Sequence, residues 1–126
     1  MPALSRVTPI LRFFDEAHTR AFYLDFLGFT VDWEHRFEDN FPLYLQVSRD
    51  DCVLHLSEHY GDVCPGAAIR IAVADLDGFH AALSARGSRY AKPEIETMPW
   101  DSREMTVRDP ASNRLVFVAS DAPDEG

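Results

Sequence analysis

The stretch AAIRIAVADLDGFHAALSARG at residues 67–87 has the same organisation as VTPILRFFDEAHTRAFYLDFLGF at residues 7–29, about 60 residues earlier. Each stretch opens with a short apolar run that favours a strand. Each then has an aspartate suited to cap a helix, Asp15 or Asp75, and each helical pattern ends near a glycine, Gly28 or Gly87. The sequence therefore predicts two copies of one structural module.

Strand-like segments follow each predicted helix. They cover residues 30–36, 41–47 and 51–58 in the first half, and 95–98, 104–108 and 114–119 in the second. Turns are expected at Ser48–Asp50 and at DPASN, residues 109–113. The order β-α-β-β-β thus occurs twice, over about residues 5–60 and 66–120. We predict an α+β fold in one domain, residues 1–126, whose two modules form a cupped mixed β-sheet with a concave ligand pocket.

Each predicted helix has apolar residues three and four positions apart, which should form its buried face. In the first helix these residues are Ala17, Ala21, Phe22, Leu24 and Phe26. In the second they are Leu76, Phe79, Ala82 and Leu83.

Composition excludes several classes of function. The 126 residues carry a net charge of −9, from 21 acidic and 12 basic side chains. No basic stripe is present to neutralise phosphates, so we expect neither nucleic acid nor an anionic membrane surface as partner. No apolar run approaches the roughly 20 residues that span a bilayer, and no signal peptide is expected. The acidic excess either keeps the protein soluble or favours a cationic small molecule.

The chain has two cysteines, Cys52 and Cys64. They form no C-x-x-C pair, which argues against a thiolate zinc site. We expect both thiols to be reduced and the protein to be cytoplasmic.

Three segments resemble the glyoxalase/bleomycin resistance protein/extradiol dioxygenase superfamily, also called vicinal oxygen chelate proteins. They are PILRFFDEAHTRAFYLDFLGF (9–29), DCVLHLSEHYGD (51–62) and PWDSREMTVRDPASNRLVFV (99–118). The third is most similar to the bleomycin resistance proteins that bind antibiotic. The resemblance covers about residues 5–120 and implies the duplicated βαβββ fold.

Enzymes of this superfamily hold a divalent metal with side chains from four strands. The matching positions here are Thr8, His55, Ala68 and Val116. Only His55 could ligate, whereas a catalytic metal needs about three protein ligands. The sequence HLSEH, 55–59, spells H-x-x-E-H, but its two histidines would lie about 13 Å apart along a strand. We therefore expect no metal, no other cofactor and no catalytic residue.

Without a metal, the resemblance implies a homodimer that sequesters a cationic, amphipathic antibiotic of bleomycin type in a groove at the subunit interface. It also implies exchange of the N-terminal strand through a proline, and Pro9 stands at the matching position. Such a groove needs aromatic plates and acidic groups. The candidate ligand-binding residues are Asp32, Trp33, Phe37, Phe41, His55, Trp100 and Asp101, and Tyr44 is a further aromatic candidate.

Two alternatives remain open. The chain could be a metal-dependent lyase or dioxygenase of the same superfamily with rearranged ligands, or it could bind an unrelated metabolite. Two departures from the antibiotic-binding pattern bear on this choice. Asp101 stands where family members often have glycine, and Ile71 stands where some have tryptophan.

Overall fold

The computed structural model describes residues 2–87 and 92–120. Its elements are β1 (Ile10–Arg12), α1 (Glu16–Arg20), the π-helix η1 (Ala21–Phe26), β2 (Thr30–Arg36), β3 (Leu43–Arg49), β4 (Cys52–Ser57), β5 (Ala68–Val73), α2 (Leu76–Arg86), β6 (Ile95–Thr97), β7 (Arg103–Arg108) and β8 (Arg114–Ala119). The predicted α+β fold with two βαβββ modules is confirmed.

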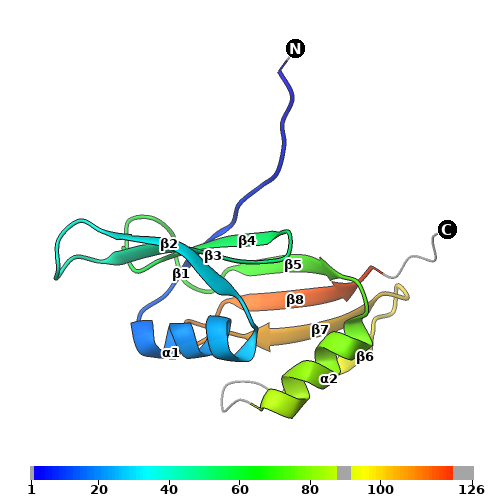
Figure 1. Ribbon diagram of the computed structural model, residues 1–126. Coiled ribbons are helices and arrows are strands. Elements are labelled where there is room, and N and C mark those ends of the chain that lie inside the picture. Colours follow the sequence, from blue (N-terminus) through cyan, green and yellow to red (C-terminus); the bar gives the residue numbers. More distant parts are fainter. Residues whose placement is uncertain (1, 88–91, 121–126) are drawn as a thin grey trace.

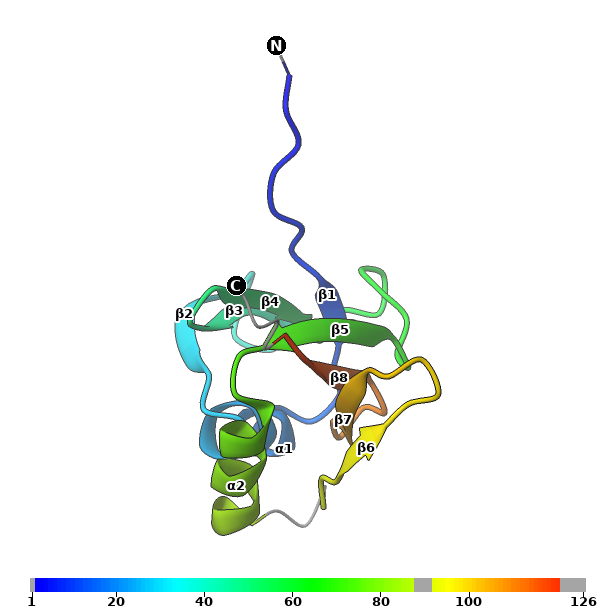
Figure 2. The same ribbon diagram turned by 90° about the vertical axis from the view of Figure 1, so that its right-hand side faces the viewer.

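Each module forms its own four-stranded mixed sheet. The N-terminal sheet has the order β1-β4-β3-β2, and the C-terminal sheet has the equivalent order β5-β8-β7-β6. In each sheet the first and last strands of the module pair in parallel, and the other neighbours are antiparallel. Figures 1 and 2 show α1 and α2 on one side of the N-terminal sheet, beside the C-terminal sheet. We call the face of each sheet turned away from the helices its outer face.

The inner faces of both sheets share one apolar core with the helices. On β3 the side chains alternate, with Leu43, Leu45 and Val47 buried inside and Tyr44 and Gln46 outside. The core also includes Leu11, Phe22, Phe26, Leu56, Leu76, Leu83, Met105, Leu115 and Phe117, drawn from both modules. Within the described residues, no helix is long and apolar enough to cross a membrane.

The first helical segment departs from the predicted regular helix. The amide of Leu27 donates to the carbonyl of Phe22, five residues back, at 3.0 Å. This wider turn places Tyr23 in the core, fully buried, whereas Ala17 is exposed and Leu24 is only partly buried. The predicted buried face was therefore wrong at Ala17 and omitted Tyr23. In α2 the prediction holds better, since Leu76 and Leu83 are buried.

The predicted helix caps at Asp15 and Asp75 are confirmed, whereas the β3–β4 turn lies at other residues than predicted. Asp15 accepts a hydrogen bond from the amide of His18 at 2.8 Å, and Asp75 accepts one from Gly78 at 3.0 Å. The β3–β4 turn falls at residues 50–51 rather than 48–50, because Asp50 adopts the left-handed conformation with φ of 53°. Both strands consequently pair through to the residues beside it.

A buried polar network joins the two modules. Asp109, which is 5% exposed, accepts hydrogen bonds from the hydroxyl of Tyr23 at 2.6 Å and from the side chain of Asn113 at 2.9 Å. Asn113 also donates to the carbonyl of Arg12 at 2.8 Å and accepts from the amides of Gly66 and Ala67. The DPASN turn therefore fastens the C-terminal module to the first helix and first strand.

Candidate ligand-binding site

The outer face of the N-terminal sheet carries a continuous chain of hydrogen bonds across β2, β3 and β4. Asp32 accepts from the amide group of Gln46 and from the hydroxyl of Ser48, both at 3.0 Å. The side-chain oxygen of Gln46 lies 2.9 Å from Nε2 of His55, and Nδ1 of His55 lies 2.7 Å from the hydroxyl of Tyr44. These five side chains hold one another in a single arrangement.

The chain of contacts also fixes which atoms donate. Because Nε2 of Gln46 donates to Asp32, the oxygen of Gln46 is the acceptor toward His55. Nε2 of a neutral His55 therefore carries the proton, and Nδ1 accepts from the hydroxyl of Tyr44. The imidazole is thus held in one tautomer, with both nitrogens engaged. The hydrogen bonds from Gln46 and Ser48 also lower the pKa of Asp32, so this carboxylate stays charged at neutral pH and below its usual titration range.

Aromatic rings cover this polar chain. The ring of Trp33 lies nearly parallel to that of Tyr44, with centroids 6.0 Å apart and 9° between the planes, and it meets His55 edge-on at 5.3 Å. Trp33 remains 43% exposed, so one part of its ring is open to a ligand. The outer face thus combines an accessible aromatic plate with a fixed carboxylate.

Two further predicted residues lie beyond this cluster, in the connection between β2 and β3. Phe37 and Phe41 contact each other with ring centroids 5.3 Å apart, and they are 71% and 44% exposed. Phe41 lies outside the strand predicted to begin there, because β3 starts only at Leu43, after Pro42. The N-terminal sheet and its hairpin therefore hold five of the seven predicted ligand-binding residues.

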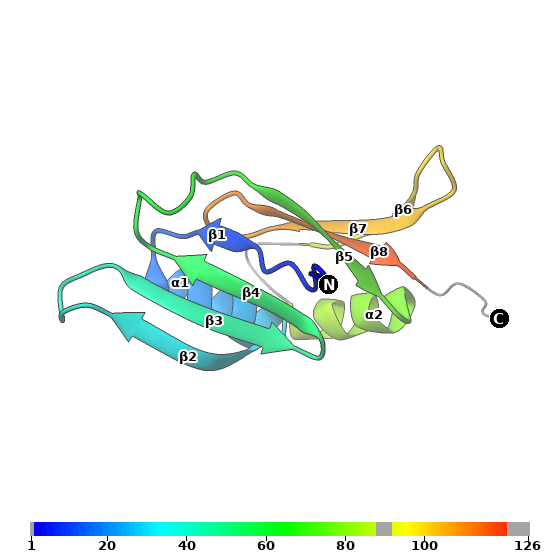
Figure 3. The same cartoon turned by 90° about the horizontal axis from the view of Figure 1, so that it is seen from above.

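Trp100 and Asp101 lie on the other sheet, in the connection between β6 and β7. Figures 1 and 3 place this hairpin at the opposite end of the molecule from the β2–β3 hairpin. Trp100 is 62% exposed, and Asp101 occupies a left-handed turn position with φ of 69°. A single chain therefore does not bring Trp100 to the Trp33 cluster.

An open groove of about 930 Å³ separates the two sheets. Its walls include β5, the start of β4, and Val7 and Pro9 of the N-terminal segment. Within the described residues, β5 pairs only with β8, and β1 pairs with β4 only along His55–Ser57. Two unpaired strand edges consequently border the groove.

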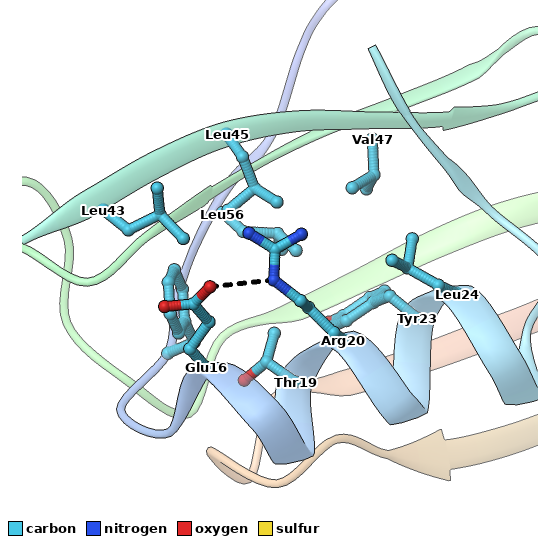
Figure 4. Close-up of a pocket in the computed structure, with 10 residues that line it drawn as sticks. Glu16, Thr19, Arg20, Tyr23, Leu24, Leu43, Leu45, Val47 and Leu56 are labelled. Carbon is cyan, nitrogen blue, oxygen red and sulfur yellow. Dashed lines mark hydrogen bonds and ion pairs between the residues drawn. The ribbon is translucent and has the colours of Figure 1, made fainter. Parts of the chain in front are cut away.

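A second, much smaller cavity lies between α1 and β3 (Figure 4). Its volume is about 10 Å³, and apolar side chains such as Leu45 and Tyr23 fill most of its surroundings. Arg20 at its mouth is bound to Glu16 and to Glu34, both at 2.9 Å. This space holds at most a single water molecule and is not a ligand site.

The residues present do not fit the superfamily's catalytic metal. Of the four matching positions, Ala68 and Val116 have no donor atom, and both nitrogens of His55 are engaged. In the H-x-x-E-H segment, Glu58 accepts from the amide of Leu43 and His59 accepts from the amide of Gly61. No group of three or more His, Cys, Asp or Glu within the described residues is arranged to hold a metal ion.

Sequence reasoning missed Gln46 and Ser48, and it listed Tyr44 only as an aromatic ring. A signal was present, because polar residues at 44, 46 and 48 alternate with the apolar residues 43, 45 and 47. Such alternation places the polar set on one face of a strand. The missing information was which strands lie beside β3, and in which register.

Comparison with known proteins agrees with this fold. The family model described as "Glyoxalase superfamily protein" matches residues 3–123. No curated protein matches this chain. A bleomycin-binding protein from bleomycin-producing Streptomyces verticillus, solved with copper(II)-bleomycin, is 29% identical, with a TM-score of 0.72 over 95% of this chain and 99% of that one.

Two other solved structures share the fold at lower identity. A bleomycin resistance determinant encoded on the transposon Tn5 is 23% identical, with a TM-score of 0.71 over 92% of this chain and 98% of that one. Lactoylglutathione lyase from Agrobacterium tumefaciens is 14% identical, with a TM-score of 0.73 over 99% of this chain and 100% of that one. With the duplicated βαβββ topology and a family match across nearly its whole length, this chain belongs to the glyoxalase superfamily.

Proposed function

We propose that this protein binds a cationic, amphipathic small molecule of bleomycin type and sequesters it without chemical change. The observation that carries the proposal is the outer face of the N-terminal sheet. There the exposed ring of Trp33 lies beside Asp32, a carboxylate whose pKa is lowered by hydrogen bonds from its neighbours. A planar ligand stacks on the ring, and its cationic group is attracted to the carboxylate. The 29% identical bleomycin-binding protein supports this ligand class.

The proposed site is completed by a second copy of the chain. Trp33 and Trp100 lie on outer faces that one chain keeps apart, so a homodimer is required to face one against the other. Asp101, Phe37 and Phe41 would border the same groove between subunits. This arrangement agrees with the usual position of small-molecule sites between structural units.

Exchange of the N-terminal segment would join the two copies. The segment before β1 runs away from the body of the chain in Figures 1 and 2, and Leu4 and Val7 on it are almost entirely exposed. Pro9, directly before β1, cannot donate to a neighbouring strand and suits a hinge. The partner's segment fits the groove between β4 and β5, where two strand edges lack a partner among the described residues.

The metal-free part of the proposal rests on donor chemistry. Two of the four family positions cannot ligate, and His55 is committed to Tyr44 and Gln46. A cytoplasmic location is supported by two cysteines that form no disulfide, Cys52 and Cys64. The binding function and the absence of a catalytic metal are therefore proposed together.

Calorimetric titration with metal-free bleomycin tests the ligand class. We expect saturable binding that falls at least tenfold in Trp33→Ala and in Trp100→Ala. Tyr60→Ala is the matched control, because Tyr60 is an aromatic residue that is 82% exposed but lies outside the proposed groove. No heat at high micromolar bleomycin, or equal loss in the control, would refute this ligand.

Metal analysis tests the alternative of a lyase or dioxygenase with rearranged ligands. We expect protein purified without chelators to contain much less than one zinc, nickel or iron per chain. A stoichiometric metal whose removal abolishes an activity would replace the binding proposal with an enzymatic one.

A further inference from the structure

A second polar cluster lies on the outer face of the C-terminal sheet and involves residues that the sequence did not single out. Glu104 on β7 is only 6% exposed. Arg70 on β5 reaches across β8 to it, with its Nη2 2.9 Å and its Nη1 3.5 Å from the two carboxylate oxygens. Arg70 itself remains 58% exposed. The pair therefore has a buried acceptor and an accessible donor.

Trp100 is attached to the same carboxylate. Its indole Nε1 donates to Oε2 of Glu104 at 3.4 Å, and this is the oxygen that also accepts from Nη2 of Arg70. The backbone on either side of Trp100 is tied as well, since the amide of Met98 donates to Ser102 at 2.7 Å and the amide of Asp101 donates to Met98 at 2.8 Å. The ring is 62% exposed while its N–H is anchored.

We propose that Glu104 is a positioning residue that fixes Trp100 as a stacking plate, and that Arg70 presents its remaining N–H donors beside the plate to an acceptor oxygen on a planar ligand. The subsite therefore takes an aromatic group carrying a carboxylate or carbonyl oxygen. Because both side chains share one carboxylate oxygen, the guanidinium and the indole edge lie next to each other. The part of this proposal that concerns Arg70 and the ligand, the ligand clause, rests on the proposed binding function. The part that concerns Glu104 and Trp100, the positioning clause, does not.

The charge balance agrees with these roles. Hydrogen bonding from Arg70 lowers the pKa of Glu104, so this carboxylate stays ionised and remains an acceptor for the indole at neutral pH. The guanidinium has five N–H donors and uses two of them on Glu104. The remaining donors are available to a ligand, since Arg70 is more than half exposed.

The positioning clause is tested without any ligand. The chain has two tryptophans, so Trp33→Phe leaves Trp100 as the only one and makes its fluorescence specific. In this background we expect Glu104→Leu to increase the local motion of the indole in time-resolved anisotropy, and to raise its quenching by acrylamide at least twofold. Glu104→Gln keeps an acceptor oxygen. It should change the anisotropy decay and the acrylamide quenching by less than about 25% relative to the parent.

One control and one fallback variant accompany this test. Thr106→Leu changes an exposed side chain on the same face of β7 and should leave the anisotropy decay unchanged. Should Glu104→Leu fail to fold, Arg70→Gln removes the ion pair while retaining the carboxylate, and the indole should keep at least part of its order. An indole equally ordered in Glu104→Leu and in the parent would overturn the positioning role.

The ligand clause is tested by nuclear magnetic resonance with two planar probes, 1-naphthoate and 1-naphthylmethylammonium. We expect naphthoate to shift the indole N–H resonance of Trp100, and Arg70→Gln to weaken naphthoate at least fivefold while changing the cationic probe less than twofold. Equal weakening of both probes, or no effect on naphthoate, would overturn the role of Arg70. Failure of bleomycin to bind, with naphthoate still dependent on Arg70, would instead refute the proposed function alone.

Discussion

Tyr23 joins the two modules through one buried hydrogen bond. Its fully buried hydroxyl donates to Asp109 at 2.6 Å, and Asp109 also accepts from the amides of Ala111 and Asn113 at 2.9 Å. A buried carboxylate is tolerated only when its oxygens are satisfied. The tyrosine thus supplies a hydrogen bond that the carboxylate cannot replace with water.

We therefore expect Tyr23→Phe to lower the free energy of unfolding by about 1–3 kcal/mol, because it leaves a buried acceptor partly unsatisfied. The measurement is the midpoint of urea unfolding. Tyr60→Phe removes the same hydroxyl from a side chain that is 82% exposed, and it should change stability by less than about 0.5 kcal/mol. Equal effects of the two substitutions would contradict the role assigned to the Tyr23–Asp109 bond.

The same residue predicts an alkaline limit to stability. Burial, together with the charge of Asp109, raises the pKa of Tyr23 well above its ordinary value. Above about pH 10 the unfolded chain therefore releases a proton that the folded chain retains. Tyr23 consequently leaves the free energy of unfolding unchanged below pH 10 and lowers it progressively as the pH rises further. Tyr23→Phe should show a shallower loss between pH 10 and 11 than Tyr60→Phe in urea unfolding. Parallel slopes would argue against this contribution.

At the scale of elements, the end of the first helical segment is held by arginines from both modules. Arg49 donates to the carbonyl of Leu27 and Arg86 donates to that of Phe26, each at 2.6 Å. Cations at this position satisfy free carbonyls and suit the negative end of the helix dipole. Gly28, with φ of 83°, lets the chain turn directly beneath these two guanidinium groups.

Gly28→Ala should be more destabilising than Gly66→Ala, although both glycines have similar positive φ values of 83° and 85°. A methyl group at Gly28 would lie 3.0 Å from Nη1 of Arg49 and 3.3 Å from Nη1 of Arg86, whereas at Gly66 it would meet nothing within 4 Å. We expect about 1 kcal/mol for the left-handed conformation alone, and about 2–3 kcal/mol where the arginines must also move. Thermal or urea unfolding of the two variants measures the difference, and equal losses would exclude the arginine contacts as its cause.

At the scale of the whole molecule, the open groove and the extended N-terminal segment together predict a dimer. Light scattering should give about twice the chain mass of 14.3 kDa. Leu4→Asp combined with Val7→Asp should shift the protein toward the monomer and weaken bleomycin binding in parallel, because these side chains are exposed in one chain and would be buried in the partner's groove. Tyr60→Asp, which replaces another large exposed side chain by a charged one, should leave the mass unchanged. A monomeric parent, or a dimer indifferent to the double substitution, would contradict the exchange.

Features that depend on neighbouring residues were predictable from the sequence. The caps at Asp15 and Asp75 and the DPASN turn involve groups within four residues of each other, so their residue types suffice to predict them. β2 and β8 occur where apolar and turn patterns placed them. The π-helical turn was not predictable, because its wider hydrogen bond is favoured by packing of Tyr23 against the second module rather than by local preference.

The candidate site likewise has features that were predictable from the sequence and features that depend on the tertiary structure. The sequence by itself determined the residue types, namely aromatic rings and carboxylates on strands and hairpins, and their alternation along β3. Tertiary structure alone decided that Asp32, Gln46 and His55 form one hydrogen-bonded chain, since this depends on the register of three strands. The tertiary structure also decided that Trp100 and Arg70 both donate to Glu104, on a separate sheet. The physical reason is that contacts between distant segments are set by strand pairing and burial over the whole core, which no local pattern encodes.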